Sequence, residues 1–130
     1  MTNKITDSGA RAVLALRAME ANAFRVSQVT TRLLDERTDL PELIAVRPTA
    51  TATDAMIDLQ PLNVDDARQW AASLGIELEI KHEADYLPGW WVRRSCGRTV
   101  IDGVTVFVVT SETYSPEEWA ALQAAEAVTA

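Results

Sequence analysis

Two β-rich runs that meet at Asp102-Gly103, within residues 90–112, form the sharpest pattern of apolar and polar positions in the chain. An aspartate–glycine pair between such runs predicts a β-hairpin, because the favoured two-residue turn needs positive φ at both central residues. In that register Cys96 faces Val109 across the two arms of the hairpin. Gly97 in the first arm is typical of a bulge, beyond which the pairing could slip by one residue.

The second arm of this hairpin is apolar on both of its faces. Its apolar side chains divide between the two faces as Val104, Val106 and Val108 on one and Phe107 and Val109 on the other. This pattern is typical of a central strand that is covered on both sides, or of a strand whose second face meets another subunit. We expect a helix over 64–74 and a C-terminal helix to cover one face. Either the N-terminal helices or a second subunit would cover the other.

Helical periodicity runs through residues 7–38, which contain no proline. Apolar or small positions recur there in steps of four and three, at Ala12, Leu16, Met19, Ala23, Val26, Thr30 and Leu33. One unbroken helix of about 32 residues would be roughly 48 Å long. A compact domain of this size is only about 35–40 Å across, so such a helix would overhang it and need a partner chain. We favour a break near 22–27 and two helices that fold back on each other, because Asn22, Ser27 and several β-branched residues weaken helix propensity there.

The remaining pattern predicts the domain organisation. Residues 41–52 contain two prolines and are interpreted as a connector between a helical N-terminal part at 1–40 and an α+β part at 53–130. The helical part, the connector and the α+β part belong to a single domain, 1–130, because 130 residues is an ordinary size for one domain.

Strand and helix periodicities alternate in the α+β part. They predict an α+β fold class: a helical N-terminal part followed by a β-α-β-β-β-α two-layer sandwich with a mostly antiparallel four-stranded sheet. A parallel pair of strands across the helix 64–74 is the alternative topology.

The content of cysteine and histidine narrows the classes of function. Cys96 is the only cysteine and His82 the only histidine, which excludes an intrachain disulfide and a Cys/His metal cluster built by one chain. No apolar run approaches the roughly 20 residues that span a bilayer. Charged residues interrupt the apolar positions of residues 1–20, which therefore lack the layout of a signal peptide. We predict a cytoplasmic protein that does not act at a membrane.

The net charge of −7 is unevenly distributed. Residues 1–47 hold seven basic and six acidic groups, or +1, and residues 48–130 hold five basic and thirteen acidic groups, or −8. An acidic chain lacks the general field that attracts proteins to nucleic acid. The charge therefore disfavours nucleic acid as a partner, although it does not forbid a local basic site.

Candidate catalytic groups are few. Cys96, His82 and Asp85 are the one nucleophilic constellation that the chain offers, but a cysteine in an apolar hairpin is more often structural. Acid–base catalysis or binding of a hard cation would need several carboxylates to converge in a cleft. The candidates are Asp54, Asp58, Glu77, Glu79, Glu83 and Asp85. Acids that alternate along a strand are more typical of a solvated face, so we predict no catalytic residue, metal, cofactor or enzymatic activity.

The most distinctive group combines aromatic and arginine side chains, the types most enriched at binding hot spots. Its members are Tyr86, Trp90, Trp91, Arg93, Arg94 and Arg98. Strand alternation places Trp90 and Arg94 on one face and Trp91 and Arg93 on the other, so at most half of the group serves one surface. One tryptophan in the core, with arginines paired to surplus acids, is the simplest interpretation. The same residue types can also bind another protein, or stack on bases and hold phosphates.

Three stretches resemble small uncharacterised α+β proteins of actinobacteria and their phages. They are the run from Leu62 to Gly75, then Pro88-Gly89-Trp90, and then Val100-Ile101-Asp102-Gly103-Val104-Thr105-Val106. The resemblance implies a host type and an association with phages or other mobile elements. It implies no activity and no functional residues.

Two function hypotheses follow. The first is a non-enzymatic protein-interaction or accessory module, regulatory in role and homodimeric, that uses the N-terminal helices or the second face of the hairpin as its interface. The alternative is a nucleic-acid-binding regulator that uses Trp90 and Trp91 with Arg93, Arg94 and Arg98.

Overall fold

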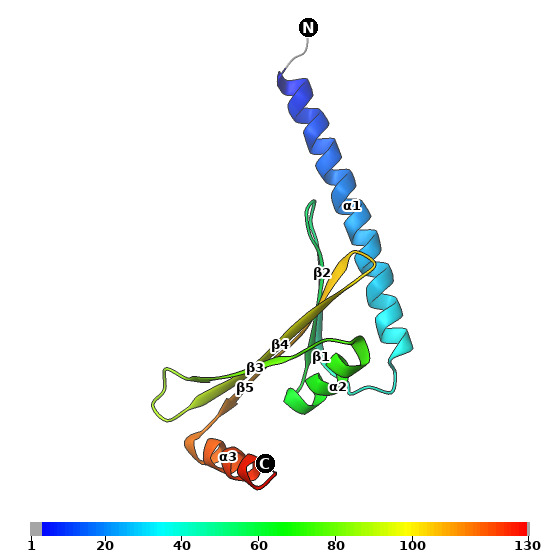
Figure 1. Ribbon diagram of the computed structural model, residues 1–130. Helices are drawn as coiled ribbons and strands as arrows, with labels where there is room; N and C mark the ends of the chain where they lie inside the picture. The colour runs from blue at the N-terminus through cyan, green and yellow to red at the C-terminus, as the bar shows by residue number, and fades with distance from the viewer. Residues whose placement is uncertain (1–3, 130) are drawn as a thin grey trace.

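The computed structural model describes residues 4–129 and contains a five-stranded mixed sheet with helices packed on one of its faces (Figure 1). In chain order the elements are α1 (Lys4–Glu36), β1 (Leu43–Ala50), β2 (Ala55–Pro61), α2 (Val64–Leu74), β3 (Glu79–Ala84), β4 (Trp91–Ile101), β5 (Val104–Tyr114) and α3 (Pro116–Thr129). The strand order is β1-β2-β5-β4-β3. The predicted α+β class is confirmed, and the sheet has one strand more than predicted.

Three of the four pairings between neighbouring strands are antiparallel, as predicted for most of the sheet. β4 pairs antiparallel with β5 and with β3, and β1 pairs antiparallel with β2. The parallel neighbours are β2 and β5. The strands on either side of α2 are not neighbours, because the hairpin of β4 and β5 lies between β2 and β3.

α1 is a single unbroken helix, so the break predicted near 22–27 is wrong. Asn22 lies on the side of α1 that faces the sheet, and its Nδ2 donates a hydrogen bond of 2.8 Å to the carbonyl oxygen of Thr51. The β-branched Val26 and Val29 are buried against the sheet together with Leu33. Their burial and this hydrogen bond outweigh the weak helix propensity of the segment.

The connector predicted at 41–52 is wrong over most of its length, because Leu43–Ala50 forms the edge strand β1. Pro48 is compatible with this strand because an edge strand needs backbone donors on one side only. The segment before β1 is fixed by Trp70 of α2, whose Nε1 donates a hydrogen bond of 2.8 Å to the carbonyl oxygen of Pro41.

The hairpin has the predicted turn and register. Asp102 and Gly103 have φ values of 50° and 78°, and Cys96 pairs with Val109. No bulge occurs at Gly97, since the pairing runs without a shift over the whole of β4. Gly97 instead allows another segment to pass close to β4: a Cβ there would lie 2.5 Å from Cγ2 of Ile76 and 2.6 Å from the carbonyl oxygen of Glu77.

One hydrophobic core fills the space between the sheet and the helices α1 and α2. Its members are Val26, Val29 and Leu33 (α1), Ile57 and Leu59 (β2), Ala67, Trp70 and Ala71 (α2), Ile76, and Val104, Val106 and Val108 (β5). Asn63 caps α2 through its Oδ1, which accepts a hydrogen bond of 2.8 Å from the Asp66 amide, and Gly75 ends the helix with a φ of 68°. α3 packs on the same face of the sheet, at the other end of the hairpin, through Trp119.

Candidate interaction surfaces

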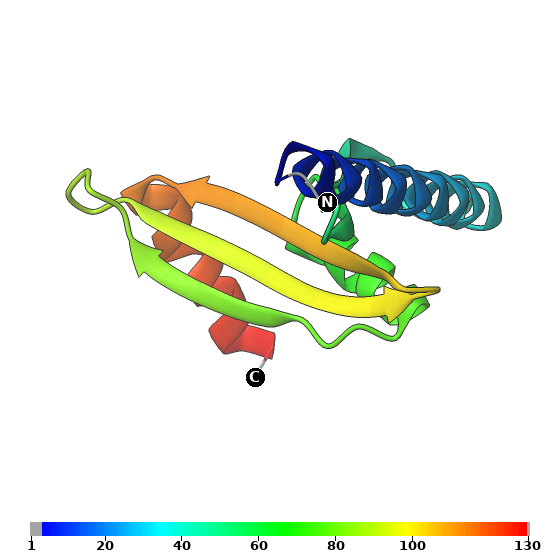
Figure 2. The ribbon, with the colours of Figure 1, turned by 90° about the horizontal axis from the view of Figure 1, so that it is seen from above.

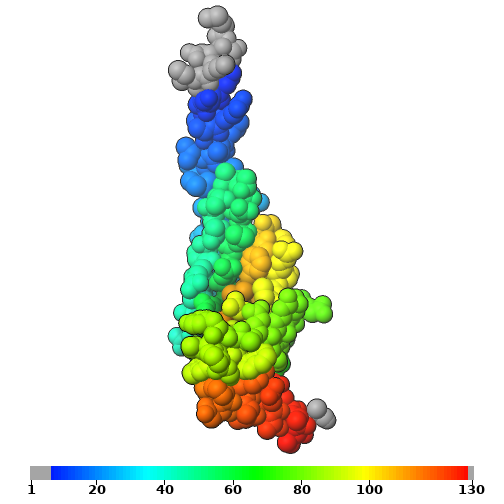
Figure 3. All heavy atoms as spheres, turned by 90° about the vertical axis from the view of Figure 1, so that its left-hand side faces the viewer, coloured from blue at the N-terminus to red at the C-terminus, as the bar shows by residue number. Residues whose placement is uncertain are grey.

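The N-terminal half of α1 projects beyond the rest of the molecule. The turn between β1 and β2 reaches α1 at Asn22, and residues 4–21, here called the arm, continue past it (Figure 1, Figure 3). The arm is roughly 27 Å long at about 1.5 Å per residue. Of the side chains at 7–21, only that of Ala18 is even partly buried. The arm thus has no packing partner within the described chain.

Large apolar side chains lie exposed on and next to the arm: Val13, Leu14, Leu16, Met19 and Phe24. Leu16 is 54% exposed and Leu14 64% exposed. The stripe of apolar or small positions that the sequence shows between Ala12 and Leu33 is divided into two parts. Its C-terminal positions Val26 and Leu33 are buried on the sheet, whereas Leu16 and Met19 continue the same stripe without cover. The steps of four and three residues along this stripe are typical of the seam between two paired helices.

The second face of the sheet, here called the open face, carries no helix from the described part of the chain. Figure 2 looks onto β3, β4 and β5 with α2 and α3 behind them. By strand pairing and burial, its side chains are Ala45, Arg47 and Thr49 (β1), Met56, Asp58 and Gln60 (β2), Thr105, Phe107, Val109, Ser111 and Thr113 (β5), Val92, Arg94, Cys96, Arg98 and Val100 (β4), and Glu79, Lys81 and Glu83 (β3). Four basic and three acidic groups give this face +1, against −7 for the chain.

The centre of the open face is apolar, and its charges lie to the sides. Phe107 and Val109 on β5 are only partly buried. Asp58 on β2 and Arg98 on β4 lie at the same level as Phe107, one on each side of it. Among the described residues neither Asp58 nor Arg98 takes part in an ion pair. A shallow hollow next to this centre is lined by Arg47, Gln60, Arg94, Ser95, Cys96, Val109, Thr110 and Ser111.

The predicted cluster of aromatic and arginine side chains does not form one surface. Arg94 and Arg98 are on the open face, where Nε of Arg94 lies 3.6 Å from Oε2 of Glu83. Tyr86 is almost fully exposed in the turn between β3 and β4, and Trp90 is partly buried at the end of that turn. Along β4 the side chains alternate between the two faces of the sheet, as the sequence predicts.

Trp91 and Arg93 lie on the helix-covered face, beneath α3. The rings of Trp91 and Trp119 stack with their centroids 5.0 Å apart. Arg93 is 6% exposed, and its Nη1 lies 3.4 Å from Oε1 of Glu126. These two members of the predicted cluster hold α3 on the sheet, with Arg93 buried and Trp91 partly buried. The simplest interpretation of the sequence, a packed tryptophan and an arginine paired with an acid, therefore fits this half of the cluster.

Glu112 links this group to the start of α2. Its Oε1 accepts a hydrogen bond from the amide of Val64, the first residue of α2, and its Oε2 accepts one from the hydroxyl of Tyr114. A carboxylate is stabilised at a helix N-terminus because the exposed amides there carry partial positive charge. The network joins α2 and β5 beside the ring of Trp119.

The pKa of Tyr114 gives a test of this network. Burial, and next the hydrogen bond to Glu112, raise the pKa of Tyr114 from 10.0 to about 12. The folded state thus favours the neutral phenol, so the resulting stabilisation is present below pH 10 and is lost as the pH rises through about 12. In a Tyr86→Phe variant, where Tyr114 is the only tyrosine, we expect the ultraviolet absorbance of tyrosinate to appear with a midpoint near pH 12. A midpoint near pH 10 while circular dichroism still reports folded protein would contradict the network.

The candidate catalytic groups do not converge. His82 lies on the helix-covered face, with its ring 4.9 Å from that of Trp119, whereas Cys96 is exposed on the open face. The apolar hairpin therefore does not bury Cys96, because the face that carries it has no cover among the described residues. Asp58 and the acids of β3 lie on strands separated by β5 and β4. No group of three or more potential metal ligands is present among the described residues.

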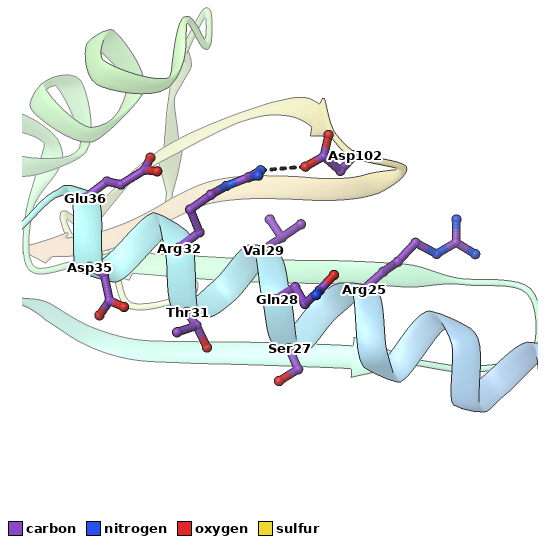
Figure 4. A pocket seen from close by; sticks show the side chains of 9 residues that line it. All are labelled: Arg25, Ser27, Gln28, Val29, Thr31, Arg32, Asp35, Glu36 and Asp102. Carbon is purple, nitrogen blue, oxygen red and sulfur yellow. Dashed lines mark hydrogen bonds and ion pairs between the residues drawn. The ribbon is translucent and has the colours of Figure 1, made fainter.

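A hollow between α1 and the hairpin turn also lacks a convergent set of ligands (Figure 4). Nη2 of Arg32 lies 2.6 Å from Oδ2 of Asp102, and this contact ties α1 to the turn. Ser27, Thr31 and Asp35 point away from that ion pair (Figure 4). The ion pair makes this hollow a contact between α1 and the hairpin.

The comparisons with known proteins leave the family of this chain open. No family model, no curated protein and no solved structure matches it. The resemblance to proteins of actinobacteria and their phages therefore stays a prediction. None of the described helices combines the length and apolar character that a bilayer crossing requires.

Proposed function

We propose that this chain is a non-enzymatic protein-interaction module that self-associates through the arm of α1. The observation that carries the proposal is the exposed apolar stripe of an unbroken helix that extends about 27 Å beyond its own domain. Large exposed apolar patches on soluble proteins mark interaction sites.

The charge distribution favours a second copy of the chain as the partner of the arm. Residues 4–21 contain three basic and two acidic groups, or +1, so two arms do not repel each other strongly. Two whole chains, at −7 each, repel elsewhere on their surfaces. Leu16 and Met19 would meet their counterparts in a seam that extends the stripe already buried at Val26 and Leu33.

A charge introduced into the seam tests the proposal. We expect a Leu16→Glu, Met19→Glu double variant, the arm variant, to weaken association through the arm by about 100-fold or more, because each chain would bring two carboxylates into an apolar contact. Light scattering coupled to size-exclusion chromatography over a range of concentrations measures the loss as a lower mass.

Leu14→Glu is the matched control, since Leu14 is as exposed as its neighbours but lies outside the stripe. It should leave the mass unchanged. An equal loss of mass in the control and the arm variant would count against a defined seam. So would a native chain that stays monomeric at high micromolar concentration.

The nucleic-acid hypothesis has less support than it had from the sequence. Trp91 and Arg93 are packed under α3, so Arg94 and Arg98 are the members of the cluster that a nucleic acid could contact on the open face. Asp58, Glu79 and Glu83 share that face and would repel phosphates.

A further inference from the structure

The open face leaves one side of the central strand β5 without cover. Val104, Val106 and Val108 are fully buried beneath α1 and α2, whereas Phe107 and Val109 point to the other side. The sequence pattern of β5 is that of a strand covered on both faces. All the described helices pack on one face, so the described residues supply no second layer.

We propose that the open face packs on the open face of a second copy, with a two-fold axis that runs along β5. This interface lies on the opposite side of the sheet from α1 and does not depend on the arm. Each molecule would supply one sheet of an aligned β-sandwich, whose core is formed by Phe107 and Val109 of both copies.

The charges on either side of β5 select this axis. Rotation about β5 places β4 of one copy over β2 of the other, at an unchanged level along the strand. Arg98 then faces Asp58 of the second copy, because both residues are at the level of Phe107 in their own sheet. Symmetry produces this contact twice. Both groups lack an ion-pair partner within the described chain and would gain one on association.

The same rotation about β5 places the outer strands β1 and β3 of the two copies over each other. Arg47 on β1 comes over β3 within two residues of the level of Glu79, while Lys81 and Glu83 face the same side further along β3. A two-fold axis perpendicular to the strands would instead place β4 of one copy over β4 of the other. Arg94 and Arg98 would then face the arginines of the second copy. The twist of the sheet separates its outer strands, so the contact between Asp58 and Arg98, next to the axis, is the one that decides the arrangement.

The size of the open face is adequate for such an interface. With a strand spacing of about 4.8 Å and strands that range from roughly 20 Å (β3) to roughly 36 Å (β4 and β5), the flat footprint is on the order of 550 Å². Side chains increase the accessible area above this footprint, toward the roughly 800 Å² per partner of a standard interface.

A charge swap between β2 and β4 tests the proposal. The experiment uses the arm variant, so that association through the arm does not contribute. We expect Asp58→Arg alone and Arg98→Glu alone each to raise the dissociation constant about tenfold or more, since each places like charges opposite each other twice. The combined Asp58→Arg, Arg98→Glu variant restores the opposite charges and should associate within about threefold of its parent. A combined variant that is as weak as the single ones, or single variants with unchanged association, would overturn the proposal.

Cys96 supplies a second measurement on the parent chain without the charge changes. Its thiol is exposed on the open face, and a second sheet would cover it. The rate of its reaction with a maleimide should therefore fall as protein concentration passes through the range of association. A rate independent of concentration, in a range where light scattering detects a dimer, would place the interface elsewhere.

Binding of nucleic acid to the open face is the outcome that would replace this proposal. In that case the arm variant stays monomeric and binds single-stranded DNA at low salt, more tightly with Asp58→Arg and more weakly with Arg98→Glu. The two interfaces can also fail separately. If the arm does not associate, the mass of the native chain equals that of the arm variant; if the open face does not associate, the arm variant is a monomer.

Discussion

Replacing Trp70 with alanine is expected to lower the free energy of unfolding by about 3–5 kcal/mol, the usual cost of truncating a large buried aromatic side chain. Trp70 is 2% exposed and packs in the core between α2 and the sheet. Its Nε1 also donates the hydrogen bond to the carbonyl oxygen of Pro41, which would lose its partner. The change removes both the largest core side chain of α2 and the contact that fixes the segment between α1 and β1.

Urea denaturation followed by circular dichroism measures this loss as a lower midpoint with an unchanged slope. Trp70→Phe keeps an aromatic ring but not the donor, so its loss of free energy should lie between zero and that of the alanine variant. Leu62→Ala is the exposed control, at 61% exposure, and should change the free energy by less than about 0.5 kcal/mol. A loss below about 1 kcal/mol for Trp70→Ala would mean that α2 is not packed as described.

Gly97→Ala is expected to cost roughly 2–3 kcal/mol, although it adds a single methyl group in a strand. The added Cβ would lie 2.6 Å from the carbonyl oxygen of Glu77, which is backbone and cannot rotate away. The segment before β3 would have to move off β4, or β4 would have to bend. Differential scanning calorimetry would detect the change as a lower unfolding temperature.

The matched control for this change is Gly9→Ala. A Cβ at Gly9 in α1 meets no heavy atom within 4 Å, and alanine is the stronger helix former. The substitution should therefore be neutral or stabilising by up to about 1 kcal/mol. If the two alanine variants had the same effect, the close approach at Gly97 would not be the cause.

The features that the sequence predicts correctly are local ones. The turn at Asp102-Gly103 fixes the register of the hairpin through its own backbone preferences, so the pairing of Cys96 with Val109 follows. Strand alternation likewise separates Arg93 from Arg94, and the structure places them on opposite faces. Both predictions depend on residues that are close in the chain.

The incorrect predictions concern contacts between distant residues. Propensity alone favours a break in α1, but burial of Val26 and Val29 against strands that lie later in the chain keeps the helix continuous. β1 contains Pro48 and is recognisable as a strand chiefly through its pairing with β2. The alignment of Asp58 with Arg98 depends on the strand order, which no local pattern specifies.

The position of α1 in the chain has a consequence for the order of folding during synthesis. α1 leaves the ribosome before β5, yet the surfaces that bury its Val26 and Leu33 include Val104 to Val108, more than 70 residues later in the chain. Helices need a stabilised first turn before they extend, and in α1 the packed C-terminal half provides it. We therefore expect α1 to become stable, and the arm to become fully helical, only after β5 has been added to the sheet.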